Sequence, residues 1–374
     1  MSGLYIHIPF CPSRCIYCDF YSQTDLSLRD AYVEAVCKET VNRLHEPPAT
    51  IYLGGGTPTQ LTTPQLTRIF QTIERAAGKR LEISTEVTIE ANPDDLTAER
   101  IDELRRLPIN RLSLGIQTFD GARLRFLRRR HTASQAIEAV HQCQAAGFDN
   151  LSIDLIFGFP NQTLSEWKDD LRQATRLNVQ HISAYALSYE EGTRLTQLLK
   201  AGQVEEVDEE LSIQMYDTLC QHLHKAGYEH YEISNFAKPG FRSCHNSAYW
   251  TETPYLGIGA GAHSFDGHMR SWNPPSISHY INKVSAGDFR REGEVLTPDQ
   301  RFNERVMTRL RTREGLPLKS IAEDFGEDRL DQLLLASQPH IAGGRLTLSS
   351  DEERLLLTHA GIFVSNDIIS DLMA

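Results

Sequence analysis

The chain has 374 residues, 40% of them hydrophobic and 24% charged, which is ordinary for a globular protein large enough for one large and one smaller domain. The formal net charge of -12 repels a nucleic-acid backbone, and no stretch reaches the ~18 apolar residues of a membrane span. With seven cysteines, an odd number, and no secretory signal pattern at the N-terminus, we expect a soluble protein of the reducing cytoplasm, without a nucleic-acid partner.

Six short apolar or β-branched runs, each followed by a helical pattern, are predicted to form parallel strands. They are "LYIHI" (4–8), "TIYLG" (50–54), "TEVTIEAN" (85–92), "RLSLGIQ" (111–117), "LSIDLIFG" (151–158) and "HISAYALS" (181–188). The segments between them place apolar residues at steps of three and four, as amphipathic helices do. The alternation predicts an α/β fold over residues 1–237, a partial (β/α)6 barrel with its chemistry at the carboxyl ends of the strands.

The first predicted strand leads into "CPSRCIYC", which places Cys11, Cys15 and Cys18 in one short loop. A disulfide framework does not suit three thiols so close together, because the other cysteines are scattered along the chain. A structural zinc site normally needs a fourth ligand, which His7 or Asp19 would have to supply. A cubane 4Fe–4S cluster held by three thiolates leaves one iron open for an outside ligand. The spacing favours the cluster, with zinc as the alternative.

Polar residues also mark the ends of the following strands. "GGGTPT" (54–59) follows the second strand, Glu90 ends the third, Gln117 ends the fourth with Arg129 after it, and Asp154 lies in the fifth. Glycines let backbone N–H groups approach a ligand closely, such as an amino-acid carboxylate. An acid inside the apolar run around Asp154 needs a partner, because an unpaired buried charge is costly. Together these features predict one binding site beside the cysteine loop.

The remainder of the chain differs in character. Residues 238–274 contain Pro and Gly upstream of a glycine-rich strand and are expected to form a loop segment. Residues 275–374 are expected to form a mainly helical domain, with a hairpin at Gly343–Gly344. Helices followed by a short hairpin are compatible with a winged-helix-like module.

The CxxxCxxC loop after the first strand resembles the signature of the radical S-adenosylmethionine (radical SAM) superfamily. Over nearly the whole chain, the sequence is similar to the HemN/HemW group of oxygen-independent coproporphyrinogen III oxidases and haem chaperones. The similar stretches are "YIHIPFCPSRCIYCDF", "IYLGGGTPTQL", "LSLGIQTF", "IDLIFGFP", "EISNFAKPG", "HNSAYW" and "YLGIGAGAHSF". The resemblance implies a 4Fe–4S cluster on the three loop cysteines, and contacts to S-adenosylmethionine from Tyr5, Tyr17, Gly55, Gly56, Thr57, Glu90, Gln117, Arg129 and Asp154.

Two features favour the chaperone branch of this group over the oxidase branch. The oxidase pattern has a further cysteine two residues after the third, where this chain has Phe20, and it carries a longer N-terminal extension. The chain is therefore not expected to be a coproporphyrinogen III oxidase, which is the alternative function. A third interpretation, a radical SAM enzyme acting on RNA or another small molecule, disagrees with the net charge.

The stretch "HNSAYW" fits the HNxxYW pattern that the resemblance associates with haem binding. It implies haem contacts from His245, Asn246, Tyr249 and Trp250. An imidazole or the neighbouring Cys244 thiolate can ligate haem iron, and aromatic rings offer flat faces to a porphyrin. Without the resemblance, a hydrogen-bonded histidine beside core aromatics is the simpler interpretation. The resemblance further implies transfer of haem to an acceptor haemoprotein, respiratory or membrane-associated, and dimers in some states.

Overall fold

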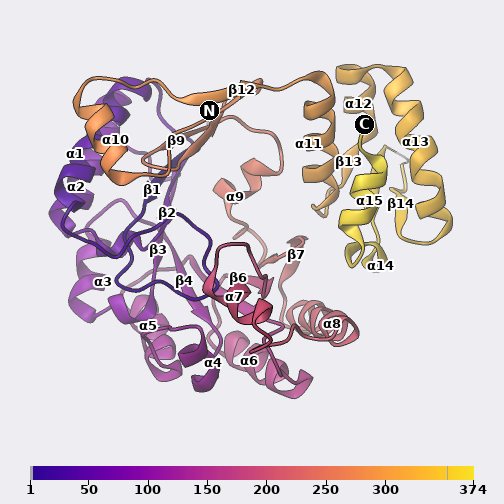
Figure 1. The fold of residues 1–374 in the computed structure, drawn as a ribbon, viewed down its shortest axis with the longest axis horizontal. Coiled ribbons are helices and arrows are strands. Elements are labelled where there is room, and N and C mark those ends of the chain that lie inside the picture. The colour runs from indigo at the N-terminus through magenta and orange to yellow at the C-terminus, as the bar shows by residue number, and fades with distance from the viewer. Residues whose placement is uncertain (1–2, 352) are drawn as a thin grey trace.

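The computed structural model describes residues 3–351 and 353–374, and its centre is a sheet of twelve strands in the order β12-β11-β10-β9-β1-β2-β3-β4-β5-β6-β8-β7 (Figure 1). The six predicted strands are all present, each within two residues of the expected bounds. They are β1 (Gly3–Ile8), β2 (Thr50–Gly55), β3 (Glu86–Ala91), β4 (Arg111–Gln117), β5 (Leu151–Phe157) and β6 (His181–Ala186), paired in parallel. The prediction of a partial (β/α)6 barrel is confirmed.

Helices cover the outer face of this sheet (Figure 1). They are α1 (Arg29–Arg43), α2 (Thr63–Ala76), α3 (Ala98–Arg105), α4 (Gly121–Phe126), α5 (Ala133–Ala145) and α6 (Leu164–Arg176). Their starts follow from local sequence: Thr62 and Gln65 form a reciprocal capping box on α2, and Thr163 and Glu166 do so on α6. Each helix then buries its apolar stripe against the strands, which builds the main hydrophobic core.

The sheet extends beyond the predicted strands on both sides. On the β6 side lie α7 (Arg194–Lys200), α8 (Glu209–Lys225), β7 (Glu229–Glu232) and β8 (Asn235–Ala237). On the β1 side lie α9 (Cys244–Tyr249), β9 (Tyr255–Ile258), β10 (His263–Phe265), β11 (Met269–Trp272), α10 (Ile277–Ser285) and β12 (Glu292–Val295). Residues 238–274, expected to form a loop segment with a glycine-rich strand, contain β9, which pairs in parallel with β1, and a helix that was not expected, α9, capped by Ser243.

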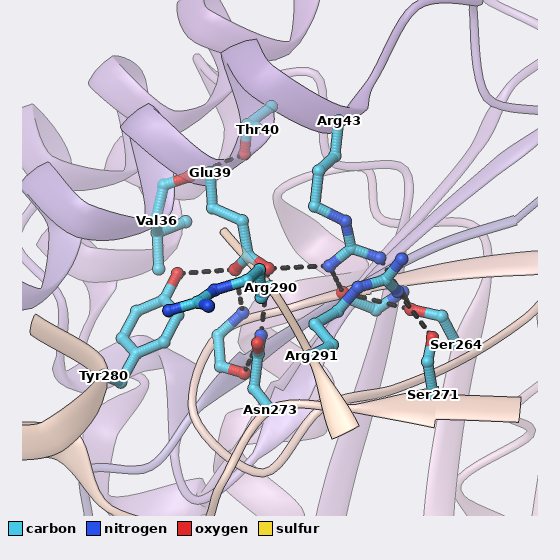
Figure 2. A network of polar contacts seen from close by, with 12 residues as sticks. Val36, Glu39, Thr40, Arg43, Ser264, Ser271, Asn273, Tyr280, Arg290 and Arg291 are labelled. Carbon is cyan, nitrogen blue, oxygen red and sulfur yellow. Dashed lines mark hydrogen bonds and ion pairs between the residues drawn. The ribbon is translucent and has the colours of Figure 1, made fainter. Parts of the chain in front are cut away.

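A buried carboxylate fastens this added part to α1 (Figure 2). Glu39 is only 1% exposed, and its oxygens accept hydrogen bonds from Arg43 (2.6 Å), the Asn273 amide (2.9 Å) and the Tyr280 hydroxyl (2.7 Å). The Gly259 N–H donates to the same carboxylate at 3.0 Å. All its acceptor positions are engaged, so the buried charge is compensated and the β9–β10 region is held against the barrel.

The C-terminal domain lies beside the barrel, at the right of Figure 1. It contains α11 (Pro298–Leu310), β13 (Leu316–Pro317), α12 (Leu318–Phe325), α13 (Glu327–Ala342), β14 (Leu346–Leu348), β15 (Arg354–Leu357), α14 (His359–Ile362) and α15 (Ser365–Leu372). A separate hydrophobic core begins at Phe302, whereas α10 and β12 belong to the barrel side, so the boundary lies just before Pro298 and not at residue 275.

Within that domain, α11, α12 and α13 precede the hairpin of β14 and β15, the order expected for a winged-helix-like module. The hairpin pairs Leu346–Leu348 with Arg354–Leu357, whereas Gly343 and Gly344, where the turn was expected, instead end α13. Backbone hydrogen bonds from Ile233 to Arg311 and from Arg313 to Tyr231 join the domain to the edge of the large sheet. Among the described residues, the helices are all too short or too polar to cross a membrane.

Candidate functional site

A cavity of about 480 Å³ runs through the barrel from the cysteine loop to α9. All three loop cysteines line it, together with every predicted S-adenosylmethionine residue except Tyr5. The Tyr5 hydroxyl instead hydrogen-bonds the His7 ring at 2.9 Å, inside the barrel wall. The fold therefore brings residues from five strand ends into one space, as a parallel barrel should.

A buried residue at the centre of the cysteine loop, Ile16, fixes the loop to the barrel. Ile16 is 5% exposed and packs in a small apolar cluster with Leu127 and Leu195. Its N–H donates to the Leu127 carbonyl at 3.3 Å, and its own carbonyl accepts from the Leu195 N–H at 2.9 Å. One apolar residue thus fixes the loop from both sides, which leaves the thiols free to face the cavity.

The three thiols suit an iron–sulfur cluster better than a zinc ion. Burial raises the pKa of the Cys11 thiol, and it raises the pKa of Cys18 to about 11. Binding a metal centre would displace these protons. Within residues 3–351 and 353–374, no set of three His, Cys, Asp or Glu side chains converges to hold a single ion. A cubane cluster does not need such convergence, because each thiolate binds a different iron.

The proposed completion of a zinc site also finds no support. Both His7 ring nitrogens are engaged, one by the Tyr5 hydroxyl and the other by the Tyr21 carbonyl at 2.9 Å. Asp19 lines the cavity next to Cys18 in the chain, but it is exposed to solvent and joins no group of three metal-binding side chains among the described residues. Phe20 is 63% exposed at the position where the oxidase pattern has its additional cysteine.

The glycine loop packs more tightly than we expected and presents different atoms. The N–H of Gly55 donates to Glu90 (3.0 Å), that of Gly56 to the Ile8 carbonyl (2.9 Å), and that of Thr57 to the Phe10 carbonyl (2.8 Å). A Cβ on Gly56 would lie 2.7 Å from the Ile8 carbonyl, so glycine is needed for this close approach. The expectation that these N–H groups face a ligand was wrong, and their use within the protein suits a site that receives an ammonium rather than an anion.

Two carboxylates line the middle of the cavity. Burial raises the pKa of Glu90 to about 7, against the opposing effect of a 2.8 Å hydrogen bond from the Tyr52 hydroxyl. Burial likewise raises the pKa of Asp154, whose carboxylate accepts from the Ser113 hydroxyl at 3.5 Å. An ammonium or ribose hydroxyl reaching this layer would meet acceptors that lack a full set of partners.

A strained residue, Gln117, and a cation, Arg129, lie close to the end of β4. Gln117 has φ of +70°, a left-handed conformation that costs a non-glycine residue about 1 kcal/mol or more, at a bulge in the pairing of β4 with β5. Arg129 donates to the Asn92 side chain at 2.6 Å and to the Cys15 sulfur at 3.5 Å, and it also binds the Gly115 carbonyl. A cation beside the Cys15 thiol is suited to a carboxylate held there.

The HNxxYW segment forms α9 and closes the opposite end of the barrel. His245 is 2% exposed, and its ring nitrogens face the Thr50 hydroxyl (2.8 Å) and the Tyr249 hydroxyl (3.0 Å). The Glu86 carboxylate accepts from the N–H groups of Cys244 and His245, both at 2.9 Å. Burial, assisted by the charge of Arg111, lowers the pKa of His245 to about 4. The histidine is thus a neutral, fully hydrogen-bonded plug in this structure.

The other residues of this motif are placed differently from His245. Asn246 lines the cavity, whereas Cys244 is exposed outside it. Tyr249 packs edge-on against Tyr255 with ring centroids 4.8 Å apart. The turn after α9 is held by the C-terminal domain, since Arg305 in α11 binds Glu252 through two hydrogen bonds of 2.7 and 3.0 Å.

The sequence did not lead us to expect the inward-facing residues of the strands below the cysteine loop. Arg111, Ser113 and Ser183 all line the cavity, as do Tyr52 and Tyr185. A signal was present, because in "RLSLGIQ" and "HISAYA" the polar residues alternate with buried apolar ones, so that one face of each strand is polar.

Comparison with known proteins gives two family matches. Residues 5–174 match the model of the radical SAM superfamily, and residues 296–364 match the HemN C-terminal domain. The latter range agrees with the domain boundary seen in the structure.

Full-length relatives also match. The chain is 35% identical to the heme chaperone HemW of Bacillus subtilis, with 98% of each protein covered. It is 32% identical to the heme chaperone HemW of Escherichia coli, with 97% of this chain and 96% of the relative covered. The structure of the coproporphyrinogen III oxidase HemN from Escherichia coli superimposes with a TM-score of 0.84 at 22% identity, over 100% of this chain and 90% of that one. At that identity the likeness shows a shared fold.

Proposed function

The chain belongs to the HemW family within the radical SAM superfamily, and on that premise we propose that it is a haem chaperone, which binds haem and passes it to an acceptor haemoprotein. The observation that carries the proposal is the HNxxYW segment, folded as a helix between the barrel and the C-terminal domain. An exposed thiol and partly exposed aromatic rings there offer the ligand and the flat faces that a porphyrin needs.

The residues at the cluster end fit the cofactors of this superfamily. Cys11, Cys15 and Cys18 would hold a 4Fe–4S cluster, whose open iron binds S-adenosylmethionine and supplies an electron to it. Ile16 fixes the loop that carries these thiols, and Arg129 holds a positive charge beside Cys15. Glu90 and Asp154 present acceptors to the amino and ribose groups of S-adenosylmethionine, and Tyr17 offers an aromatic wall.

Haem ligation by His245 would require a change at the other end of the barrel. In the closed arrangement the Thr50 and Tyr249 hydroxyls engage the imidazole that would ligate iron. Ligation by His245 therefore means that α9 lifts from the strand ends, whereas ligation by Cys244 does not, because that thiol is already exposed. A ligand that is covered in one state and presented in another suits a protein that must release its cargo.

His245 is also linked to the residues that line the proposed S-adenosylmethionine site. The His245 ring stacks on Tyr52 with centroids 5.1 Å apart, and the Tyr52 hydroxyl donates to Glu90, which in turn accepts from Gly55. Movement of His245 would thus alter the support of Glu90. We infer that occupation of the S-adenosylmethionine site and exposure of the haem ligand are coupled through this chain.

The test is a haem titration of the anaerobically reconstituted protein, followed by Soret absorption. We compare the wild type, His245→Ala with Cys244→Ser, and His263→Ala, which removes an exposed histidine stacked on Trp272 outside the cavity. The wild type and His263→Ala should bind haem and transfer it to a haem-free globin, and the double variant should lose binding at least ten-fold. Absence of haem uptake by the wild type under reducing conditions would exclude a chaperone.

The same preparation should be offered coproporphyrinogen III with S-adenosylmethionine. A chaperone leaves the propionates intact. Steady formation of vinyl groups with release of carbon dioxide would instead establish the oxidase, the alternative suggested by the shared fold.

A further inference from the structure

Arg111 is a buried cation that has no partner among the residues the structure describes. It begins β4, its side chain lines the cavity, and the residue is only 1% exposed. Among the described residues, its guanidinium makes no hydrogen bond or ion pair, and its Nε is sealed from solvent as well. Leaving a buried charge unpaired is costly, so a residue of this kind needs an explanation.

The neighbouring carboxylates do not supply the missing partner. Glu90 already accepts from Tyr52 and Gly55, and Asp154 faces Ser113. The charge of Arg111 lowers the pKa of both acids only as a secondary effect, behind burial. Glu86, at the start of β3, is occupied by the N–H groups of α9. The guanidinium therefore keeps its donors for a group that enters the cavity.

We propose that Arg111 receives a carboxylate of a bound ligand at the floor of the cavity, and that this ligand is the haem held at α9, through one of its propionates. A planar guanidinium matches a carboxylate with two parallel hydrogen bonds. Asn246, within the HNxxYW segment, lines the same cavity and offers an amide donor there. The inference rests on the proposed haem-chaperone function.

Position separates haem from the other carboxylate expected in this cavity, the methionyl carboxylate of S-adenosylmethionine. Arg111 and Gln117 are the two ends of β4, which at a rise of about 3.3 Å per residue places their backbones roughly 20 Å apart. The cysteine loop and Arg129 lie at the Gln117 end, whereas α9 lies at the Arg111 end. The charge of Arg111 acts to lower the pKa of both Cys244 and His245, as a smaller effect than burial. This is expected for a group close to the proposed haem ligands.

The experiment combines a side-chain change with a ligand change. Haem and haem dimethyl ester, which lacks the carboxylates, are titrated into wild type, Arg111→Met and Arg111→Lys in the reconstituted full-length protein. Arg309→Met is the control, because Arg309 also lacks a side-chain partner among the described residues but lies in the C-terminal domain. Binding of S-adenosylmethionine is measured on the same samples.

Arg111→Met should lower the affinity for haem about ten- to a hundred-fold and leave the affinity for the ester unchanged, as expected for loss of a charged hydrogen-bonded pair. In the wild type the ester should bind more weakly than haem by the same factor. Arg111→Lys should retain part of the discrimination, and Arg309→Met all of it.

Equal binding of haem and ester by the wild type would overturn the inference, even if Arg111→Met failed to fold. Loss of S-adenosylmethionine binding in Arg111→Met, with haem binding intact, would also overturn it by assigning the carboxylate to the cofactor. A wild type that binds neither haem nor its ester would instead refute the proposed function.

Discussion

At the carboxyl ends of the barrel strands, three thiols border an open cavity, whereas at the amino ends a histidine is sealed beneath α9. Cys11, Cys15 and Cys18 are each partly exposed around the buried anchor Ile16. His245 is 2% exposed, with both ring nitrogens engaged. One end is prepared to receive a ligand and the other is closed by the protein itself. The residue types of a motif thus predict its chemistry, but the groups that contact those residues in the fold decide whether that chemistry is accessible.

The largest expected effect is at the open end. Cys15→Ser should abolish the cluster, since two thiolates cannot hold three corners of a cubane, and iron content and absorption near roughly 400 nm should fall to background. Cys220→Ala, in α8 and outside the cavity, is the matched control and should keep both signals. A Cys15→Ser protein that keeps its full colour and iron content would show that Cys15 is not a cluster ligand.

The closed end should be sensitive to acid. The pKa of His245 is lowered to about 4, first by burial, whereas the unfolded histidine takes a proton below about 6.5. The stability contributed by the neutral ring is therefore complete above pH ~6.5 and is lost as the pH falls toward ~4. Between about pH 7 and about pH 5, the free energy of unfolding should drop about 2 kcal/mol more in the wild type than in His245→Gln.

Urea unfolding of both proteins at the two pH values measures this difference. Other buried groups such as His131, whose pKa is also lowered to about 4, titrate in both proteins and cancel. Identical pH dependence in the two proteins would mean that His245 is not sealed in solution.

The smallest expected effect concerns the hydrogen bond between Thr50 and His245. Thr50→Val removes the hydroxyl that faces the His245 Nδ1 at 2.8 Å, which should weaken the closed state by about 1 kcal/mol. If α9 must lift for His245 to bind iron, haem affinity should then rise about five-fold. Thr88→Val is the matched control, because the Thr88 hydroxyl is buried without a partner among the described residues.

Haem affinity in Thr88→Val should stay within about two-fold of the wild type. An unchanged affinity in Thr50→Val would indicate that haem is ligated without release of His245, as ligation by Cys244 allows. Competition titrations with a haem-binding globin would resolve a five-fold difference.

Most of the barrel was predictable because its signals are local. The six strands and the helices between them follow from apolar periodicity and N-capping residues, which act within a few positions of the chain. Apart from the glycine-rich strand, the strands of the β9 to β12 region were missed because they are short. The pairing of β9 with β1 was missed because it joins residues more than 240 positions apart in sequence. The domain boundary was misplaced for the same reason, since α10 looks like any other helix until its packing against α1 is known.

Spacing along the chain sets the thiol triplet, its place after the first strand and the alternating polar faces of the strands, so these features can be predicted without the fold. The packing of the chain settled three other points: Tyr5 lies outside the cavity, His245 fills the floor of the barrel, and Arg111 has no partner there among the described residues. Partnership and burial depend on groups brought together from distant parts of the chain, and no local pattern records which of them will meet.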